Sequence, residues 1–355
     1  MLKTALRTLL SLAMSALFVW LSLRHTGLRA VGAAIAAADP LRVLGYVGIW
    51  LLIHLVRTVR WGILLEKFGR VGFKRLNSAS AVGFMLLMIL PLRLGEFARP
   101  LLIARPAAPG AGAPIRRSAA FASIVVERIV DGIVIGLLGV VALRLLGRSA
   151  TGDYLSFARR ASVLVALGFG VLCVGLLAAL FFRERALRLT RRVFEPLSPR
   201  LATRAVSMLE AFIDGLHLGS GWKVLAFFAL TASFWTLNGL SLALLAPAFG
   251  YRGLTPLMIA IVLTIQVVGV MVPAGPGMVG TLQFFTQAGL SLFVPGAFSD
   301  PQAVAFANTI WMLQFVTQVG LGLVFLLSGH VSLKGLLGGP PSEEDSPAEG
   351  AAAAP

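Results

Sequence analysis

The sequence PLRLGEFAR, residues 91–99, interrupts a hydrophobic stretch that begins at Ala79, and PAGPGMVGTLQ, residues 273–283, interrupts a second such stretch. Proline removes a helical N–H and clashes with the preceding turn, whereas glycine permits backbone angles that other residues avoid. In hydrocarbon, such breaks survive only where the freed backbone is buried in protein or lines a wet cavity. Matched breaks in the two halves of a membrane protein are typical of a transport site. The residues expected to form the breaks and line a cavity are Pro91, Gly95, Pro273, Gly275, Pro276, Gly277, Gly280 and Gln283.

The composition indicates an integral membrane protein. Of 355 residues, 57% are hydrophobic and 13% are charged, whereas soluble domains carry about 25% charged residues. The net charge of +16 comes from basic residues between hydrophobic runs, which suits topology and anionic headgroups better than nucleic acid. We therefore expect membrane lipids as partners and no nucleic acid. The lone Cys173 and four scattered histidines predict no disulfide and no metal site.

The hydrophobic runs predict an all-α polytopic membrane fold. Runs long enough to span a bilayer lie near residues 4–23, 41–63, 118–143, 161–182, 222–249 and 302–328, and the two interrupted runs lie near 78–105 and 255–296. We expect about six full spans plus two broken, re-entrant helical hairpins. The membrane domain would cover residues 1–337, and the acidic, low-complexity segment 338–355 would be a disordered tail.

The basic loops indicate how the hairpins are oriented. Residues 66–77, 104–117 and 183–204 are rich in Lys and Arg, and such loops favour the cytoplasmic face. Simple alternation would place the first two loops on opposite faces. Two re-entrant hairpins of opposite orientation place all three loops and the C-terminus in the cytoplasm, and they allow an inverted repeat. The loop 144–160, with four arginines, then lies outside and is the weak point.

A helix near residues 198–218 is expected to lie on the membrane surface. Its apolar residues follow a helical stripe, with charged residues on the other side, as in interfacial helices. The alternative is a helix packed on a neighbouring loop.

Six charged residues near the first break form a constellation without net charge. They are Arg93, Glu96 and Arg99 in the break and Glu127, Arg128 and Asp131 in the following span. Glu127 and Asp131 share a helix face, which is unfavourable unless cations such as Arg93 and Arg99 stand opposite. The cluster is interpreted as a polar floor for a lipid headgroup. A structural ion-pair network and snorkelling at the interface remain as alternatives.

Two further arginines, Arg57 and Arg60, lie in the span 41–63 without an acidic neighbour there. They are candidates to meet a phosphate, because the guanidinium fork matches phosphate oxygens. The alternative is snorkelling to the interface, with Trp61 as an anchor. The second break carries no charge, so its backbone N–H groups and the following helix N-terminus would face an anion.

At these residues the chain resembles the flippase-like family that includes the transmembrane domain of lysylphosphatidylglycerol synthase. The resemblance rests on RTVRW (57–61), PLRLGEFAR (91–99), VERIVD (126–131) and PAGPGMVG (273–280), in this order. The family often has Gly-Gly-Leu-Gly-x-x-Glu after the late proline. Here Met278 stands for the second glycine and Gln283 for the glutamate, which puts an acidic role there in doubt.

The resemblance implies movement or handling of lipids in a bacterial inner membrane. The substrate-binding candidates are Arg57, Arg60, Arg93, Glu96, Arg99, Glu127, Arg128 and Asp131. The leading hypothesis is a lipid flippase. The alternatives are a membrane-embedded transferase acting on a lipid-linked sugar or aminoacyl group, and a non-catalytic scaffold for a lipid-synthesis enzyme. The sequence has no nucleophile–base pair, P-loop or HExxH motif, and the aminoacyl-transferase domain of the synthase is not found, so we expect neither an enzyme nor a cofactor.

Overall fold

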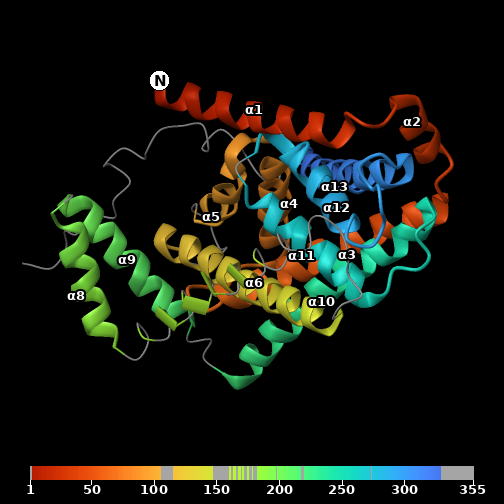
Figure 1. The fold of residues 1–355 in the computed structure, drawn as a ribbon. Coiled ribbons are helices and arrows are strands. Elements are labelled where there is room, and N and C mark those ends of the chain that lie inside the picture. Colours follow the sequence, from red (N-terminus) through yellow and green to blue (C-terminus); the bar gives the residue numbers. More distant parts are fainter. Residues whose placement is uncertain are drawn as a thin grey trace, which may run out of the picture.

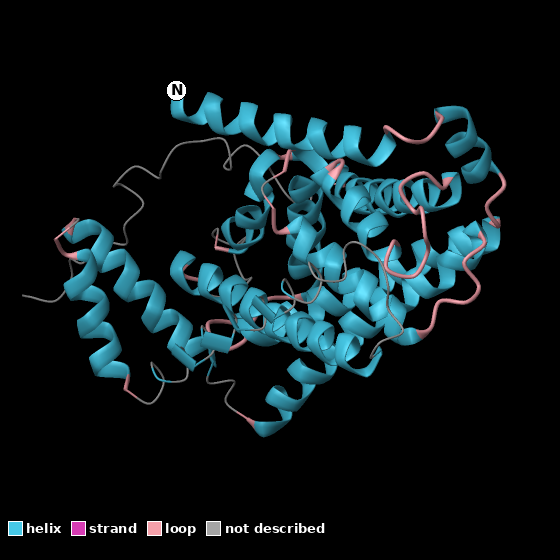
Figure 2. Ribbon diagram, viewed as in Figure 1, coloured by secondary structure: helices cyan, strands magenta, loops and turns pink. Residues whose placement is uncertain are grey.

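The computed structural model describes residues 2–104, 115–146, 182–196, 198–216, 220–272 and 274–328, and isolated positions between 160 and 178. The regular elements in these ranges are all helices (Figure 2). In order they are α1 Leu2–Leu23, α2 Leu28–Ala36, α3 Pro40–Leu65, α4 Phe73–Ile89, η1 Pro91–Phe97, α5 Ala98–Ile103, α6 Arg117–Leu146, α8 Arg183–Phe194, α9 Pro199–Leu216, α10 Gly221–Leu245, η2 Ala246–Phe249, α11 Pro256–Val270, η3 Pro276–Met278, α12 Thr281–Leu290 and α13 Pro301–Leu327.

The predicted all-α polytopic membrane fold is confirmed. Three described helical segments, Pro40–Leu65, Gly221–Phe249 and Pro301–Leu327, are long and apolar enough to cross a membrane. The 30-residue helix α6 is also long enough, although it carries the charged Glu127, Arg128 and Asp131. Only scattered residues of the expected span 161–182 are described, and the tail 338–355 lies entirely outside the described residues.

Two of the long helices begin with the same local signal. The Asp39 and Asp300 side chains accept hydrogen bonds from the backbone N–H two residues later, and proline follows each of them. Aspartate at the cap and proline in the first turn both suit a helix start, because the first N–H groups have no intrahelical partner. These caps fix where α3 and α13 enter the bundle.

The first interrupted run forms a helical hairpin, hereafter hairpin 1 (residues 73–103). The chain leaves α4 after Ile89, and η1 and α5 fold back along it. Gly95 lies so close to α4 that a Cβ there would be 2.0 Å from the Leu87 nitrogen. Arg75 Nη2 donates to the Ile103 carbonyl at 2.9 Å, which joins the two ends of the hairpin.

The second interrupted run forms hairpin 2 (residues 256–290), in which α12 packs antiparallel on α11. Gln266 Nε2 donates to Thr286 Oγ1 at 2.9 Å. Gly289 lies on Val262, where an added Cβ would be 2.9 Å from that residue's Cα. Small residues thus let the two helices approach closely, as in membrane helix pairs.

The two hairpins enter the bundle from opposite ends. Helix α3 runs the length of the bundle, and its C-terminal end, which we call the Glu66 end, is tied to α10 by the Glu66–Lys223 ion pair of 3.2 Å. Hairpin 1 begins at this end, seven residues after Glu66, and returns to it, because Arg75 and Ile103 are hydrogen-bonded. At the opposite end, the Arg42 end, Arg42 Nη1 donates to the Leu244 carbonyl at 3.2 Å. Hairpin 2 begins and ends there, since Tyr251 before it hydrogen-bonds Asp300 after it.

The helix packing relates the two halves of the chain. Each half has the order span, hairpin, span: α3, hairpin 1 and α6 in one, and α10, hairpin 2 and α13 in the other (Figure 1). Helices α3 and α10 pack on each other, while α4 packs on α13 and α11 packs on α6. Each hairpin therefore contacts the last span of the other half, which is the partner exchange expected of an inverted repeat.

The helix predicted near residues 198–218 is present as α9. It packs against both α6 and α8, with Ala202 and Ile213 buried. Its position on a membrane surface stays a prediction, and the neighbouring helix α8 was not expected from the sequence.

Candidate functional site

The two breaks meet inside the bundle. Arg93 Nη1 in the first break donates to the Val270 carbonyl, at the end of α11, at 2.8 Å. Gly277 in the second break lies against the backbone of Met88, and its carbonyl accepts a 2.8 Å hydrogen bond from Trp311 Nε1. Two segments whose contacting residues are 177 positions apart in the sequence therefore form one junction.

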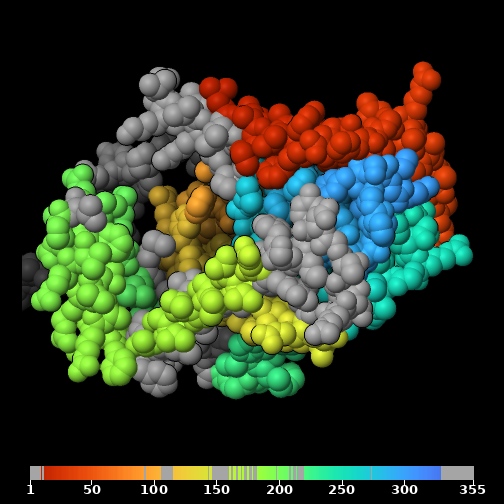
Figure 3. Space-filling model, viewed as in Figure 1, coloured from red at the N-terminus to blue at the C-terminus, as the bar shows by residue number. Residues whose placement is uncertain are grey.

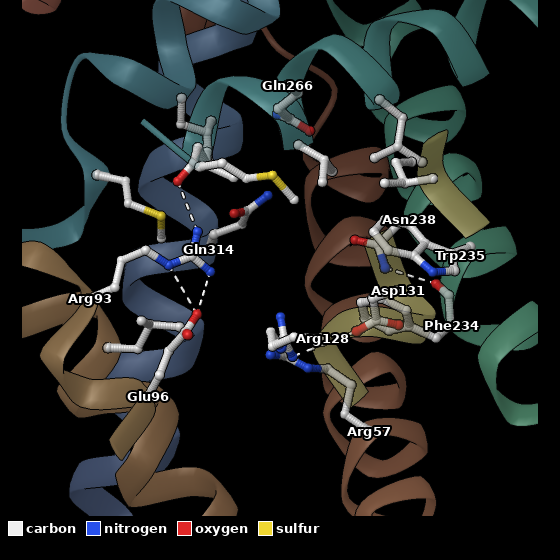
Figure 4. A pocket seen from close by; sticks show the side chains of 18 of the residues that line it. Arg57, Arg93, Glu96, Arg128, Asp131, Phe234, Trp235, Asn238, Gln266 and Gln314 are labelled. Carbon is white, nitrogen blue, oxygen red and sulfur yellow. Dashed lines mark hydrogen bonds and ion pairs between the residues drawn. The ribbon is translucent and has the colours of Figure 1, made fainter. Parts of the chain in front are cut away.

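A cavity of about 360 Å³ lies at this junction. Both hairpins line it, together with α3, α6, α10 and α13. In Figure 4 the Arg93 and Glu96 side chains stand on one side, and Arg57, Arg128 and Asp131 stand on the other. The charged lining residues are Arg57, Arg93 and Arg128 against Glu96 and Asp131, so three positive and two negative charges leave a formal surplus of +1.

At the α6 wall of the cavity, two buried carboxylates are held by arginines from three elements. Arg60 binds Asp131 in a bidentate manner, at 2.6 and 2.9 Å, and reaches Glu127 at 2.8 Å. Arg99 of α5 contacts the other Glu127 oxygen at 3.2 Å, and Arg128 approaches both acids at 3.4 and 3.6 Å. Charges at such depth are tolerated because they are paired and hydrogen-bonded.

The expected partners of the α6 acids were only partly right. Arg99 lies opposite Glu127 as predicted, but Arg93 pairs with Glu96 in its own break. Arg60 takes the place expected for Arg93. The six residues of the predicted cluster carry no net charge, and with Arg57 and Arg60 added, five arginines face three acids, so the enlarged cluster has a surplus of +2.

Arg57 is the one charged lining residue for which the described part of the chain provides no hydrogen bond or ion pair. Its side chain is buried, 9% exposed, and its guanidinium lies over the Phe84 ring at 3.6 Å. Its Nε has no hydrogen-bond partner among the described residues. Arg60 is fully buried. The snorkelling alternative is therefore wrong for Arg60, whose guanidinium turns inward to the acids of α6, and Arg57 borders the cavity rather than bulk water.

The backbone of both breaks departs from ordinary geometry. Among the described residues other than glycine, only Arg93 and Met278 have positive φ, 58° and 53°, and both line the cavity. Positive φ is costly for a side-chain residue and tends to occur at functional sites. Met278 is the position at which the resembling family often has glycine, and its positive φ gives the physical reason for that glycine.

Two backbone N–H groups of the second break already have side-chain partners. Gln283 Oε1 accepts the Gly280 N–H at 2.8 Å, and Ser15 Oγ of α1 accepts the Gly275 N–H at 2.8 Å. These two N–H groups are therefore not open to an anion, contrary to the expectation for this break. Gln283 thus fills the N3 position of a capping box, a role that a glutamine serves as well as a glutamate.

The prolines and remaining glycines of the breaks have local roles. Pro91 and Pro276 occupy the first positions of η1 and η3, where the missing N–H costs no hydrogen bond. Gly277 and Gly280 have φ of 66° and 80°. Pro273 lies outside the described residues.

Several polar and aromatic residues of the cavity were not predicted as site residues. Trp50 and Trp235 line it, and their buried indole Nε1 atoms have no hydrogen-bond partner among the described residues. Gln314 donates to Tyr46 at 3.0 Å, and Asn238 donates to a carbonyl of its own helix. A sequence signal existed for Trp50, which lies two helical turns before Arg57 on one stripe. Trp235 had none.

One family model matches the chain. Its description is "Lysylphosphatidylglycerol synthase TM region", and it covers residues 8–322. The match therefore includes both hairpins and every charged residue of the cavity. No curated protein and no solved structure matched the chain.

Proposed function

Because the chain belongs to the lysylphosphatidylglycerol synthase TM region family, which is related to lipid handling in membranes, we propose that it is a flippase. It would move a polar-headgroup lipid between the leaflets of a bacterial inner membrane. The observation that carries the proposal is the cavity between the two hairpins, bordered by a buried Arg57 that has no acidic partner among the described residues.

The charges of the cavity suit an anionic headgroup. Arg57, Arg93 and Arg128 offer more positive charge than Glu96 and Asp131 balance. A phosphodiester carries one negative charge and would neutralise the surplus of +1 along the lining. An arginine is well suited to this role, since its planar fork donates two parallel hydrogen bonds to phosphate oxygens.

The remaining walls suit the rest of a lipid. Leu87, Ile135, Leu263 and Val267 are among the apolar residues that line the cavity, and they would accompany the glycerol and upper acyl chain. The indole rings of Trp50 and Trp235, which also line the cavity, would contact the headgroup side of the lipid. Aromatic residues with one polar atom serve both environments.

The opposed hairpins support alternating access. Hairpin 1 enters from the Glu66 end, which we assign to the cytoplasm together with the C-terminus, and hairpin 2 enters from the other end. Rocking of one repeat against the other would open the shared cavity to each leaflet in turn. The charge pairs of Glu127 and Asp131 would stay intact, because separating them at this depth is costly.

Leaflet exchange in reconstituted vesicles tests the proposal. Purified protein is placed in vesicles with fluorescent phosphatidylglycerol, and the fraction of lipid reached by a membrane-impermeant quencher is followed over time. We expect faster exchange than in empty vesicles, and a loss of at least several-fold for Arg57→Gln. Arg252→Gln, at an exposed arginine that does not line the cavity, is the control and should exchange like the wild type. Exchange no faster than in empty vesicles across a panel of anionic and zwitterionic lipids would rule out a flippase.

A further inference from the structure

Helix α8 has a surface that the cavity does not use. It packs on α9 through the side of Ala186, Leu187 and Thr190, which are half-buried, and none of its residues is fully buried. In Figures 1 and 3, α8 and α9 project together from one end of the molecule, and α2 lies at the opposite end. The outward face of α8 is therefore free to meet something other than the bundle.

The outward face has an apolar stripe. Leu189 and Val193 are four residues apart on one side of α8, and Phe182, the residue before the helix, lies seven positions before Leu189. The exposed fractions of Phe182, Leu189 and Val193 are 56%, 63% and 54%. On a helix that touches only water, three such large apolar side chains would be unfavourable, since each leaves its surface exposed.

Arginines flank this stripe. Arg185, Arg188 and Arg192 follow one another at three- and four-residue spacing beside it, and Arg191 lies further round. A surface groove of about 810 Å³ along α8 is lined by these four arginines, with Leu189, Glu195 and Pro196. The Arg185 guanidinium also lies 5.5 Å from the Phe182 ring centre, so cation and apolar surface are presented side by side.

We propose that α8 is an interfacial helix that binds the anionic leaflet on the Glu66 side of the membrane. Phe182, Leu189 and Val193 would enter the headgroup–acyl boundary, and Arg185, Arg188 and Arg192 would bind lipid phosphates. An apolar stripe flanked by arginines is the pattern of helices that lie in this plane. The charge selects anionic lipid: within α8 five arginines stand against Glu184, a net of +4.

The position of α8 supports the same partner. Helix α9 packs between α8 and α6. Helix α8 lies near the start of α6 (Figure 1), at the Glu66 end of the bundle. The exposed basic residues Lys74 and Arg116 also lie at that end. A polybasic surface next to membrane spans attracts acidic lipids within a Debye length of the bilayer. This surface would bind lipid whether or not the cavity transports it.

Hydrogen exchange of the full chain tests the assignment. The protein is placed in nanodiscs of pure phosphatidylcholine or of phosphatidylcholine with phosphatidylglycerol, and amide exchange is measured by mass spectrometry. We expect exchange in α8 to slow on the order of tenfold when phosphatidylglycerol is present, and to recover in high salt. Helix α2, at the opposite end, should not respond.

Variants separate lipid binding from protein packing. The triple variant Arg185→Gln/Arg188→Gln/Arg192→Gln should abolish the lipid-dependent slowing, with unchanged exchange in α13 as the check on folding. Arg24→Gln/Arg29→Gln/Arg252→Gln removes the same charge at the other end and should behave as the wild type. Equal exchange of α8 in both lipids, or slow exchange that survives the first triple variant, would overturn the proposal. The second of these outcomes would mean that α8 is held by protein contacts.

Discussion

Arg93 Nη1 lies 2.8 Å from the carbonyl oxygen of Val270, so the break of hairpin 1 caps the last turn of α11 in hairpin 2. The last carbonyls of a helix have no intrahelical partner, and a cation is favoured there by the helix dipole. Arg93 also pairs with Glu96 and holds a positive φ of 58°. This residue therefore joins the two repeats at the point where their hairpins meet.

The double role of Arg93 predicts a coupling that mutation can measure. Arg93→Ala removes partners from both Glu96 and the Val270 carbonyl, whereas Glu96→Ala leaves the contact with Val270 in place. We expect Arg93→Ala to lower the free energy of unfolding more than Glu96→Ala. The double variant should be less destabilised than the sum, with a coupling of about 0.5 to 3 kcal/mol. Denaturant unfolding in detergent gives the free energy of unfolding of each variant. If the two single substitutions destabilise equally and their effects add up in the double variant, Arg93 and Glu96 are not coupled.

Arg57 and Arg60 should respond in opposite ways to the same substitution. Arg60→Gln leaves Glu127 and Asp131 without their closest partner and should destabilise by about 3 to 5 kcal/mol. Arg57→Gln removes a buried cation that has no acidic partner among the described residues. The relief of its burial cost, several kcal/mol, outweighs a cation–π contact with Phe84 on the order of 2 kcal/mol.

Thermal unfolding in lipid-free detergent checks this contrast. Arg57→Gln should unfold at or above the wild-type temperature, and Arg60→Gln well below it. Added phosphatidylglycerol should stabilise the wild type and have a smaller effect on Arg57→Gln, because ligand binding to the folded state raises its stability. A clear destabilisation by Arg57→Gln would assign Arg57 a structural role instead.

The hairpins and their opposite orientation could be predicted because their signals are local. Pro91 and the glycines of both breaks have backbone preferences that hold in any context. The basic loops constrain topology through a rule that needs no tertiary structure. Charges deep in an apolar run must also find partners, which makes the cluster around Glu127 predictable.

The pairing within the site could not be predicted, since it depends on contacts between distant segments. Ser15 accepts the Gly275 N–H across 260 residues, and a lone serine in α1 gives no signal of this. Likewise, Arg60 and Arg93 carry the same charge, and only the packing of α3 on α6 decides which one reaches Asp131. Helix α8 escapes prediction because its five arginines are also typical of a loop that sets topology.

The raised pKa of Tyr251 leads us to expect that the protein loses stability at alkaline pH. It lies outside the membrane-spanning segments, and burial raises the pKa of its phenol above the usual value, with a further rise from the hydrogen bond to Asp300. The folded state thus favours the protonated phenol. The stabilisation is complete below the unfolded pKa of about 10 and is lost as the pH rises through the higher folded pKa.

Unfolding measured as a function of pH tests this role. The wild type should lose stability above pH about 10, and Tyr251→Phe should show a shallower loss over the same range because it has no proton to release. At neutral pH the variant should be slightly less stable, since Asp300 loses a hydrogen-bond donor. Identical alkaline slopes for the two proteins would show that other groups control the transition.

The orientation of the hairpins predicts which positions share a membrane face. Lys74 lies in the first turn of hairpin 1 and Arg116 lies beyond its end, Arg252 and Ser299 flank hairpin 2, and all four are exposed. In a Cys173→Ala background, Lys74→Cys and Arg116→Cys should react with a membrane-impermeant thiol reagent only from the cytoplasmic face. Arg252→Cys and Ser299→Cys should react only from the opposite face.

Each pair tests one hairpin, because both of its flanks must return to the side from which it enters. A hairpin that crossed the bilayer would separate its two flanks. Labelling of Lys74→Cys and Arg116→Cys from opposite faces would therefore exclude a re-entrant hairpin 1, whatever the result for hairpin 2. If each pair stays together but all four positions label from one face, the hairpins are not opposed, and the inverted repeat fails. The opposed arrangement requires that one pair is labelled only from the cytoplasmic face and the other pair only from the opposite face. With the hairpins opposed in this way, motion of either hairpin could open the cavity to the leaflet on its own side.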